Sequence, residues 1–259
     1  MRKHIRRIYL GLILFLLYLP ILVLIVFSFN DTKLRGVWAG FTLHWYQDLF
    51  SDSMILRAFF YTALVALIAT LVSTLLGTLS AIGIYALKNR QKNWILNVNY
   101  LPILNPDIVT GVALMSLYAF FRLDLGLLTL TLSHIVFCLP YVIISVLPKL
   151  EQLNRSMIEA ALDLGATPAY AMVHVIFPQI KPGVVSGALM AFTLSIDDFI
   201  ISFFTTGKGV SNLSIALYSM TKTGVNPSIN ALSTLLFVSI FLLLLLMNYK
   251  GTDLMKFEV

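Results

Sequence analysis

Six long apolar runs constrain this chain more than any other feature of its sequence. They cover approximately residues 8–29, 58–87, 97–121, 125–148, 183–205 and 230–249. Each run is long enough to cross about 30 Å of hydrocarbon as a helix. Because 59% of the residues are hydrophobic and only 12% are charged, a soluble fold is excluded. The sequence predicts an all-α, polytopic membrane protein with six transmembrane helices in a single domain, residues 1–259.

The Lys and Arg residues predict how the chain is oriented, because segments rich in them stay in the cytoplasm. With the N-terminus inside, the cytoplasmic segments hold Arg2, Lys3, Arg6, Arg7, Lys88, Arg90, Lys92, Lys149, Arg155, Lys181, Lys250 and Lys256. The outer segments hold Lys33, Arg35, Arg57, Arg122, Lys208 and Lys222. Both termini are therefore predicted to be cytoplasmic. The net charge of +6 is a topology signal and an attraction to membrane lipid, and it does not indicate nucleic-acid binding.

The basic start of the chain is typical of a signal peptide, but the first apolar run is too long for one. It also lacks a cleavage site with small residues. We therefore expect an uncleaved membrane anchor.

The polar segment 150–182 lies between the fourth and fifth runs, on the predicted cytoplasmic side. Ser156 and Glu159 have the spacing of a capping box, which predicts a helix that starts near Met157. Gly165 fits the left-handed position just after the end of such a helix.

A second short helix should follow in the same segment. Thr167 is a suitable cap with Pro168 at the first helical position, and Pro178 should end this helix. Two short helices with small alanines on one face would form a compact cytoplasmic knob.

Asp197 and Asp198 are two carboxylates inside the fifth apolar run. A charge in hydrocarbon costs roughly 2.5 kcal/mol or more, so such residues normally face a cavity or a partner. Along a continuous helix from Pro182, at about 1.5 Å per residue, they lie roughly 22–24 Å away, in the outer half of the membrane. A cation arriving from outside would meet them there. The alternative for either carboxylate is a hydrogen bond to Ser195, Ser202 or a neighbouring helix.

Adjacent helical residues point about 100° apart, so the two carboxylates cannot both face one narrow pathway.

An aromatic segment, 40–46, follows the first run. Thr42 can cap a short amphipathic helix that presents Trp45. Two roles for Trp45 remain open. It can anchor the chain at the outer membrane interface, or its ring can line the outer mouth and hold an ammonium group by a cation–π interaction.

The third run contains its own helix breakers, within 101–111. We expect a break around Pro102 and a helix that restarts near Pro106, with Asn105 as its cap. Asp107 then lies at the positive end of that helix. Its carboxylate either stabilises the helix end or contacts substrate.

The sequence predicts no catalytic site, no metal site and no bound cofactor. Gly207, Lys208 and Gly209 lack the upstream glycine and the following Ser or Thr of a phosphate-binding loop. Cys138 is the single cysteine and lies in an apolar run, where packing is its expected role. The histidines are scattered and form no ligand set.

Residues 159–178 resemble the EAA loop in membrane subunits of bacterial ABC importers, whose pattern is E-A-A, three residues, G, nine residues and I-x-L-P. Glu159, Ala160, Ala161, Gly165 and Pro178 match this pattern, and Val175 and Phe177 replace Ile and Leu. We call residues 150–182 the EAA loop. In that family the loop docks on a cytoplasmic ATPase, which implies docking roles for Glu159, Ala160, Ala161 and Gly165.

Shorter motifs resemble the permease subunits of bacterial spermidine/putrescine ABC importers. They are Trp45-Tyr46, Asn105-Pro106-Asp107, 137–141, Asp197-Asp198, 218–220, 224–225 and 230–232. The resemblance implies the type I ABC importer permease fold in the bacterial inner membrane. It also implies polyamine import together with a second homologous permease subunit, an ATPase dimer that binds the ATP, and a periplasmic polyamine-binding protein. The substrate pathway would use Asp198, Asp197 and Trp45, with Asp198 favoured within the pair.

Other functions stay open. The chain could be an importer permease for another small organic cation, or a secondary transporter coupled to an ion gradient. Transport without an ATPase would distinguish the last class. An intramembrane aspartyl protease is disfavoured, because its two carboxylates would have to lie on different helices and face one water.

Overall fold

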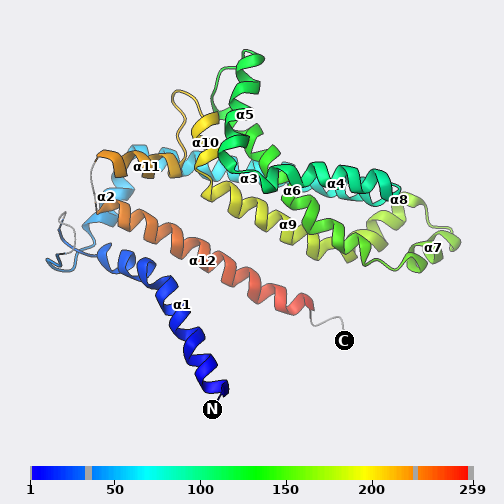
Figure 1. Cartoon of the computed structure of the whole chain (residues 1–259), viewed down its shortest axis with the longest axis horizontal. Coiled ribbons are helices and arrows are strands. Elements are labelled where there is room, and N and C mark those ends of the chain that lie inside the picture. Colours follow the sequence, from blue (N-terminus) through cyan, green and yellow to red (C-terminus); the bar gives the residue numbers. More distant parts are fainter. Residues whose placement is uncertain (1, 33–36, 224–226, 256–259) are drawn as a thin grey trace. The chain divides into compact units, whose positions relative to one another are not determined.

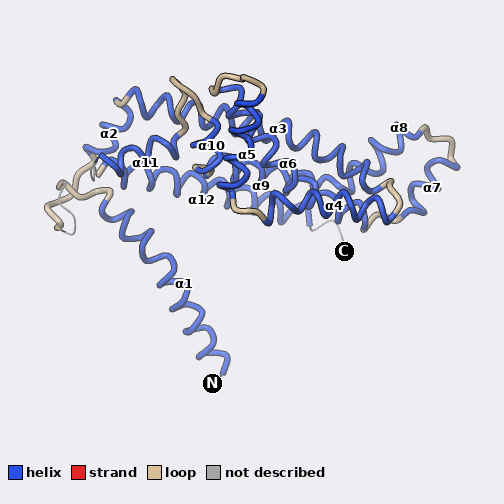
Figure 2. The backbone as a smooth tube through the Cα atoms, turned by 45° about the horizontal axis from the view of Figure 1, so that its top comes forward, coloured by secondary structure: helices blue, strands red, loops and turns tan. Residues whose placement is uncertain are grey.

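The computed structural model describes residues 2–32, 37–223 and 227–255. The helices are α1 (Arg2–Phe27), α2 (His44–Ser51), α3 (Ser53–Tyr85), α4 (Asn89–Leu104), α5 (Asp107–Phe120), α6 (Leu127–Glu151), α7 (Arg155–Asp163), α8 (Pro168–Ala171), the π-helical turn η1 (Met172–Ile176), α9 (Phe177–Asp197), α10 (Ile200–Thr205), α11 (Leu213–Thr223) and α12 (Ser228–Met255). Within the described residues, β structure is limited to one isolated bridge, between Asn30 and Phe41. Figures 1 and 2 show that helices joined by short loops make up nearly the whole chain, which confirms the predicted all-α class.

Two compact units divide the chain. The terminal unit comprises Met1–Leu56 and Ala216–Val259, and the central unit comprises Arg57–Ile215. In the terminal unit, α12 contacts both α1 and α2. The central unit holds a continuous apolar core built mainly by α6, with side chains from α3, α5 and α9 packed against it.

The apolar helices agree with most of the predicted spans. In the described part of the chain, four helices are long and apolar enough to cross a membrane, beginning at Arg6, Ser53, Leu127 and Pro168. The pair α4 and α5 passes the same test together but is bent by 103°. Helix α12 covers the sixth predicted run. Its portion Ser228–Ser239 is apolar but shorter than the four spans above. The predicted count of six is consistent with this arrangement.

The break in the third span lies a few residues later than predicted. Helix α4 runs through Pro102 and ends at Leu104, so the predicted break at Pro102 is wrong. Asn105 is extended, with ψ of 146°, because a residue that precedes proline is disfavoured in the helical region. Pro106 is also extended, with ψ of 137°. Asp107 begins α5 as expected, but the cap position belongs to Pro106, and the cap predicted at Asn105 is wrong.

Helices α6 and α9 approach each other closely through small residues. A Cβ atom added at Gly183 would lie 2.8 Å from the carbonyl oxygen of Ser145. One added at Gly187 would lie 3.2 Å from Cα of Val142. The two glycines are four positions apart, so both lie on one face of α9, as in the small-residue motifs that pack membrane helices. Only glycine lets the two backbones come this close.

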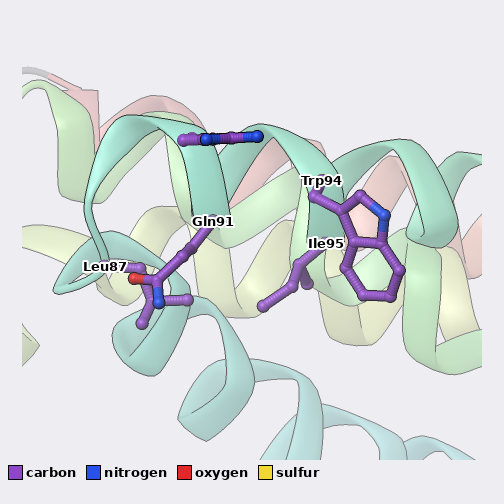
Figure 3. A pocket seen from close by; sticks show the side chains of 5 residues that line it. Leu87, Gln91, Trp94 and Ile95 are labelled. Carbon is purple, nitrogen blue, oxygen red and sulfur yellow. The ribbon is translucent and has the colours of Figure 1, made fainter.

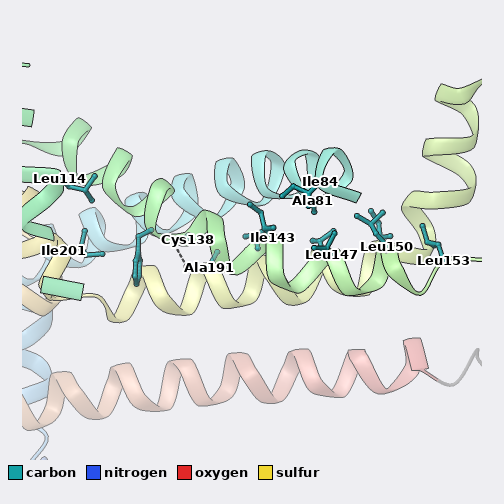
Figure 4. Packing of buried hydrophobic residues seen from close by; sticks show 14 of the residues in the cluster. Ala81, Ile84, Leu114, Cys138, Ile143, Leu147, Leu150, Leu153, Ala191 and Ile201 are labelled. Atoms are coloured by element: carbon teal, nitrogen blue, oxygen red, sulfur yellow. Dashed lines mark hydrogen bonds between the residues drawn. The ribbon is translucent and has the colours of Figure 1, made fainter. Parts of the chain in front are cut away.

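The core along this contact is shown in Figure 4, where side chains from α3 and α6 gather above α9. Cys138 is fully buried there, and its thiol donates a hydrogen bond to the carbonyl oxygen of Ala191, at 3.4 Å. The predicted packing role of Cys138 is confirmed.

The close contact predicts a stability effect. Gly183→Ala would push a methyl group into the backbone of α6, and overpacking of this kind costs about 1–3 kcal/mol of unfolding free energy. We expect the melting temperature of the purified complex in detergent to fall. Gly83→Ala on α3 is the matched control, because nothing lies within 4 Å of a Cβ atom there. Equal melting temperatures for the two variants would contradict the close-contact account.

Candidate functional site

The EAA loop begins with a helix whose cap differs from the predicted one. Asn154 is the N-cap of α7, and its side chain accepts a hydrogen bond from the N–H of Ser156, at 3.1 Å. The capping box predicted at Ser156 is therefore wrong. Helix α7 starts at Arg155, about half a turn before the predicted start near Met157. The physical reason is that asparagine caps as well as serine does, and Asn154 comes first in the chain.

The end of α7 agrees with the prediction. Gly165 has φ of +86°, in the left-handed region. The N–H of Ala166 donates to the carbonyl of Ala161, at 3.0 Å, and the N–H of Gly165 donates to that of Leu162, at 2.9 Å. These two bonds form a Schellman motif, which satisfies the last carbonyl groups of the helix. Gly165 thereby fixes the direction in which the chain leaves α7.

The second helix of the loop starts as predicted but does not stop where predicted. Thr167 accepts a hydrogen bond from the N–H of Tyr170, at 3.2 Å, and Pro168 occupies the first turn of α8. The predicted end at Pro178 is wrong, because the helix passes through η1 into α9. In η1 the N–H of Phe177 donates to the carbonyl of Met172, five residues earlier, so the missing N–H of Pro178 falls in the first turn of α9.

The EAA loop presents a largely uncovered surface at one end of the α6 and α9 pair, where α7 and α8 are seen in Figure 1. Glu159, Ala160 and Gly165 are exposed, and Ala161 is half-buried. Leu164, at the tip, is 89% exposed.

The acidic pair does not lie in one continuous helix, as predicted for span 183–205. Helix α9 ends at Asp197, Asp198 is extended with ψ of 128°, and α10 starts at Ile200. Asp197 is exposed, and none of the described residues pairs with its carboxylate. Asp198 is 9% exposed.

Asp198 is held by the start of α10. Its Oδ1 accepts a hydrogen bond from the N–H of Ile201, at 3.1 Å. Its Oδ2 accepts from both the N–H and the hydroxyl of Ser202, each at 2.7 Å. The hydrogen-bonding alternative that the sequence left open therefore describes Asp198, while Asp197 keeps an uncovered charge. The break gives two neighbouring carboxylates two different surroundings.

His134 is a member of this site that the sequence did not reveal. It projects from α6 between Ser195 and Ser202 and is 1% exposed. The two serines lie 61 and 68 residues away in sequence, so no local pattern could have indicated their contacts with His134.

Trp45 lies in the terminal unit, in the short helix α2. The hydroxyl of Thr42 accepts a hydrogen bond from the N–H of His44, at 3.1 Å, but the N-cap of α2 is Leu43, so the cap predicted at Thr42 is wrong by one residue. The ring of Trp45 is only 7% exposed, and its Nε1–H donates to the carbonyl of Asn30, at 2.8 Å. Asn30 in turn bonds the backbone of Val37 and Ala39. Trp45 thus helps to fix Asn30, which in turn holds Val37 and Ala39.

An open pocket of about 440 Å³ lies at the start of α4 (Figure 3). Leu87, Arg90, Gln91, Trp94 and Ile95 line it. The sequence analysis did not predict this pocket, and none of the candidate site residues lines it.

The family is decided by a match along most of the chain. The sequence pattern of the binding-protein-dependent transport system inner membrane component matches residues 73–249, which include the EAA loop and the acidic pair. This chain belongs to that family. As a member of it, the chain is a transport permease subunit of the kind found in inner membranes.

Characterised relatives in the same family are similar along nearly their whole length. The spermidine/putrescine transport system permease protein PotC of Haemophilus influenzae is 35% identical over 92% of this chain and 92% of its own length. PotC of Escherichia coli is 38% identical over 86% of this chain and 84% of its own. The putrescine transport system permease protein PotI of Escherichia coli is 38% identical over 85% of this chain and 81% of its own length.

Solved structures confirm the fold. The chain is similar to a subunit of a bacterial ABC transporter that imports the acidic polysaccharide alginate, with a TM-score of 0.73, 17% identity and coverage of 97% of this chain and 98% of that one. It is also similar to a chain of the inward-facing methionine ABC transporter MetNI, with a TM-score of 0.62, 19% identity and coverage of 78% and 94%. The predicted ABC importer permease fold is thus confirmed.

Proposed function

We propose that this chain is a membrane-spanning subunit of an ATP-driven importer that carries polyamines of the spermidine and putrescine class into the cytoplasm. The observation that carries the proposal is the 35–38% identity to three polyamine permeases over 85–92% of the chain. The exposed carboxylate of Asp197, inside an apolar span, supports a cationic substrate. It disfavours an anion, which a like charge would repel.

The proposed complex contains four kinds of subunit. This chain pairs with a second, homologous permease subunit, and a dimer of cytoplasmic ATPases binds and hydrolyses the ATP. A periplasmic binding protein delivers the polyamine. The chain itself binds no nucleotide, and both of its termini lie in the cytoplasm of a bacterial cell.

The EAA loop is the proposed docking site for the ATPase. Glu159, Ala160 and the tip residue Leu164 offer a compact, mostly apolar surface that the other subunit could cover. Gly165 sets the angle between α7 and α8. Movement of the ATPases would therefore be transmitted through α8 and η1 directly into α9, the helix that carries Asp197.

We assign different roles to the two carboxylates. Asp197 compensates the charge of the passing cation, because its side chain is open and unpaired among the described residues. Asp198 holds the helix break through its three hydrogen bonds. This reverses the preference for Asp198 that came from the family resemblance, since a carboxylate with three donors has little capacity left for substrate.

Trp45 contributes through packing in this proposal. Trp45→Phe keeps an aromatic ring but leaves the carbonyl of the buried Asn30 without its donor, which costs about 1–3 kcal/mol. We expect uptake to fall in Trp45→Phe as well as in Trp45→Leu, together with the melting temperature of the complex. A cation–π role would instead leave uptake largely intact in Trp45→Phe and reduce it only in Trp45→Leu.

Substrate competition tests the proposed substrate class. The complete complex would be expressed in a bacterial host that lacks its own polyamine importers, and uptake of labelled spermidine measured. We expect uptake that excess putrescine inhibits and excess methionine leaves unchanged. If spermidine does not enter the cells while another organic cation does, the chain serves that cation and the polyamine assignment is wrong.

A further inference from the structure

The break between α9 and α10 lacks the usual causes of a helix break. Residues 190–206 contain neither proline nor glycine, and their apolar character suits a continuous helix. The chain nevertheless leaves the helical region at Asp198, whose ψ is 128°. Within the segment, the carboxylate of Asp198 holds the start of α10, and a side chain from another helix also contacts both sides of the break.

A buried imidazole bridges the two sides of the break. Nδ1 of His134 lies 2.7 Å from the hydroxyl of Ser195, in α9. Nε2 of the same ring lies 2.9 Å from the hydroxyl of Ser202, in α10. It also lies 3.5 Å from Oδ2 of Asp198, at the break itself. One side chain of α6 thus contacts the segment before, at and after the interruption.

The hydroxyl of Ser202 fixes the directions of the hydrogen bonds around His134. A carboxylate accepts only, so the single hydroxyl hydrogen of Ser202 points to Asp198. Nε2 of His134 must then carry the hydrogen that it shares with Ser202. In the neutral ring Nδ1 is the acceptor, and the hydroxyl of Ser195 donates to it. Both ring nitrogens of His134 therefore have a suitable partner: Nε2 donates to Ser202, and Nδ1 accepts from Ser195.

Asn212 completes the arrangement from the loop that follows α10. Its Nδ2 donates to the hydroxyl of Ser202, at 2.6 Å, and to the backbone carbonyl of Asp198, at 3.2 Å. The second bond satisfies a carbonyl that the break would otherwise leave without a partner. His134, Ser195, Ser202 and Asn212 are each no more than 2% exposed, so bonds lost here would not be replaced by bulk water.

We propose that His134 is a positioning residue for transport, because it ties the two sides of the break together and so keeps the carboxylate of Asp197 open. This inference rests on the proposed role of Asp197 in the pathway. If α9 continued as a helix, Ile200 and Ile201 would follow Asp197 by three and four residues on the same face. Their side chains would cover the carboxylate that the break leaves free.

Accessibility of position 197 tests the inference independently of transport. In the complete complex, Asp197→Cys would be treated with a cationic methanethiosulfonate reagent, and modification of this subunit followed by mass spectrometry. The native Cys138 is fully buried and does not compete. We expect rapid modification, and a rate at least about fivefold lower when His134→Leu is added. His134→Gln keeps one donor and one acceptor and should restore most of the rate.

An unchanged rate of modification at position 197 in an assembled complex that carries both Asp197→Cys and His134→Leu would overturn the inference. If that variant does not assemble, Ser195→Ala decides instead, because it removes a single bond to the imidazole. A reduced rate in Ser195→Ala supports the inference, and the parental rate overturns it. Uptake assays are read separately. If labelling depends on His134 but Asp197→Asn transports polyamine normally, the pathway role of Asp197 fails while the positioning by His134 stands.

Discussion

Asp197→Asn is expected to lower polyamine uptake by at least about tenfold, equivalent to ~1.4 kcal/mol of lost stabilisation of the transported cation. The substitution keeps the size of the side chain and removes its charge. Because Asp197 is exposed and bonds none of the described residues, the subunit should still fold and assemble. Uptake of labelled spermidine, divided by the amount of complex in the membrane, measures the effect.

Asp124→Asn is the matched control for this experiment, since Asp124 is an exposed carboxylate in the loop before α6 and outside the apolar spans. Its uptake should stay within about twofold of the parent, as for a solvated surface charge. Equal uptake by Asp197→Asn and Asp124→Asn would remove Asp197 from the pathway.

Gly165→Val is expected to uncouple the permease from its ATPase. Valine at φ of +86° is strained by roughly 1–2 kcal/mol, and its branched side chain resists the left-handed turn. The Schellman bonds at the end of α7 would be lost and the docking surface displaced. Both uptake and the ATP hydrolysis stimulated by substrate should fall at least about tenfold, a coupling energy of ~1.4 kcal/mol.

Gly165→Asn separates the turn from the side chain. Asparagine tolerates the left-handed region, and nothing lies within 4 Å of a Cβ atom at this position. This variant should therefore retain most of the coupled activity. If the variants Gly165→Val and Gly165→Asn have equal coupled activity, the conformation of Gly165 has no part in coupling.

The sequence was informative wherever the structure depends on neighbours along the chain. The apolar runs located the spans, because a membrane segment must be long and continuously apolar. Thr167 and Pro168 marked the start of α8, and Gly165 marked the end of α7, because each acts on backbone groups within one turn.

Several local predictions failed because the sequence also contained a competing feature nearby. Asn154 took the cap from Ser156, and the extended Asn105–Pro106 step displaced the break expected at Pro102. The π-helical turn before Pro178 let the helix continue through a residue that usually ends one. In each case the sequence contained both candidates, and propensity alone could not rank them.

The break at Asp198 could be predicted only in part from its own segment, where Asp198 can bond the first N–H groups of α10. The bonds of Asn212 and His134 also hold it, and these exist only once α6 packs against α9 and α10. This tertiary effect overrode the helical preference of residues 190–206. It also gave the two aspartates different surroundings. In a continuous helix their side chains would have differed only in the direction in which they point.

Reconstitution tests the central proposal most directly. The purified complex of this chain with its partner permease, ATPases and binding protein would be placed in liposomes, and accumulation of labelled spermidine measured. We predict accumulation that requires hydrolysable ATP on the ATPase side and the binding protein on the other, and that stops with a non-hydrolysable ATP analogue. Accumulation driven by an ion gradient without ATP, or ATP hydrolysis that moves no polyamine, would contradict the proposed function.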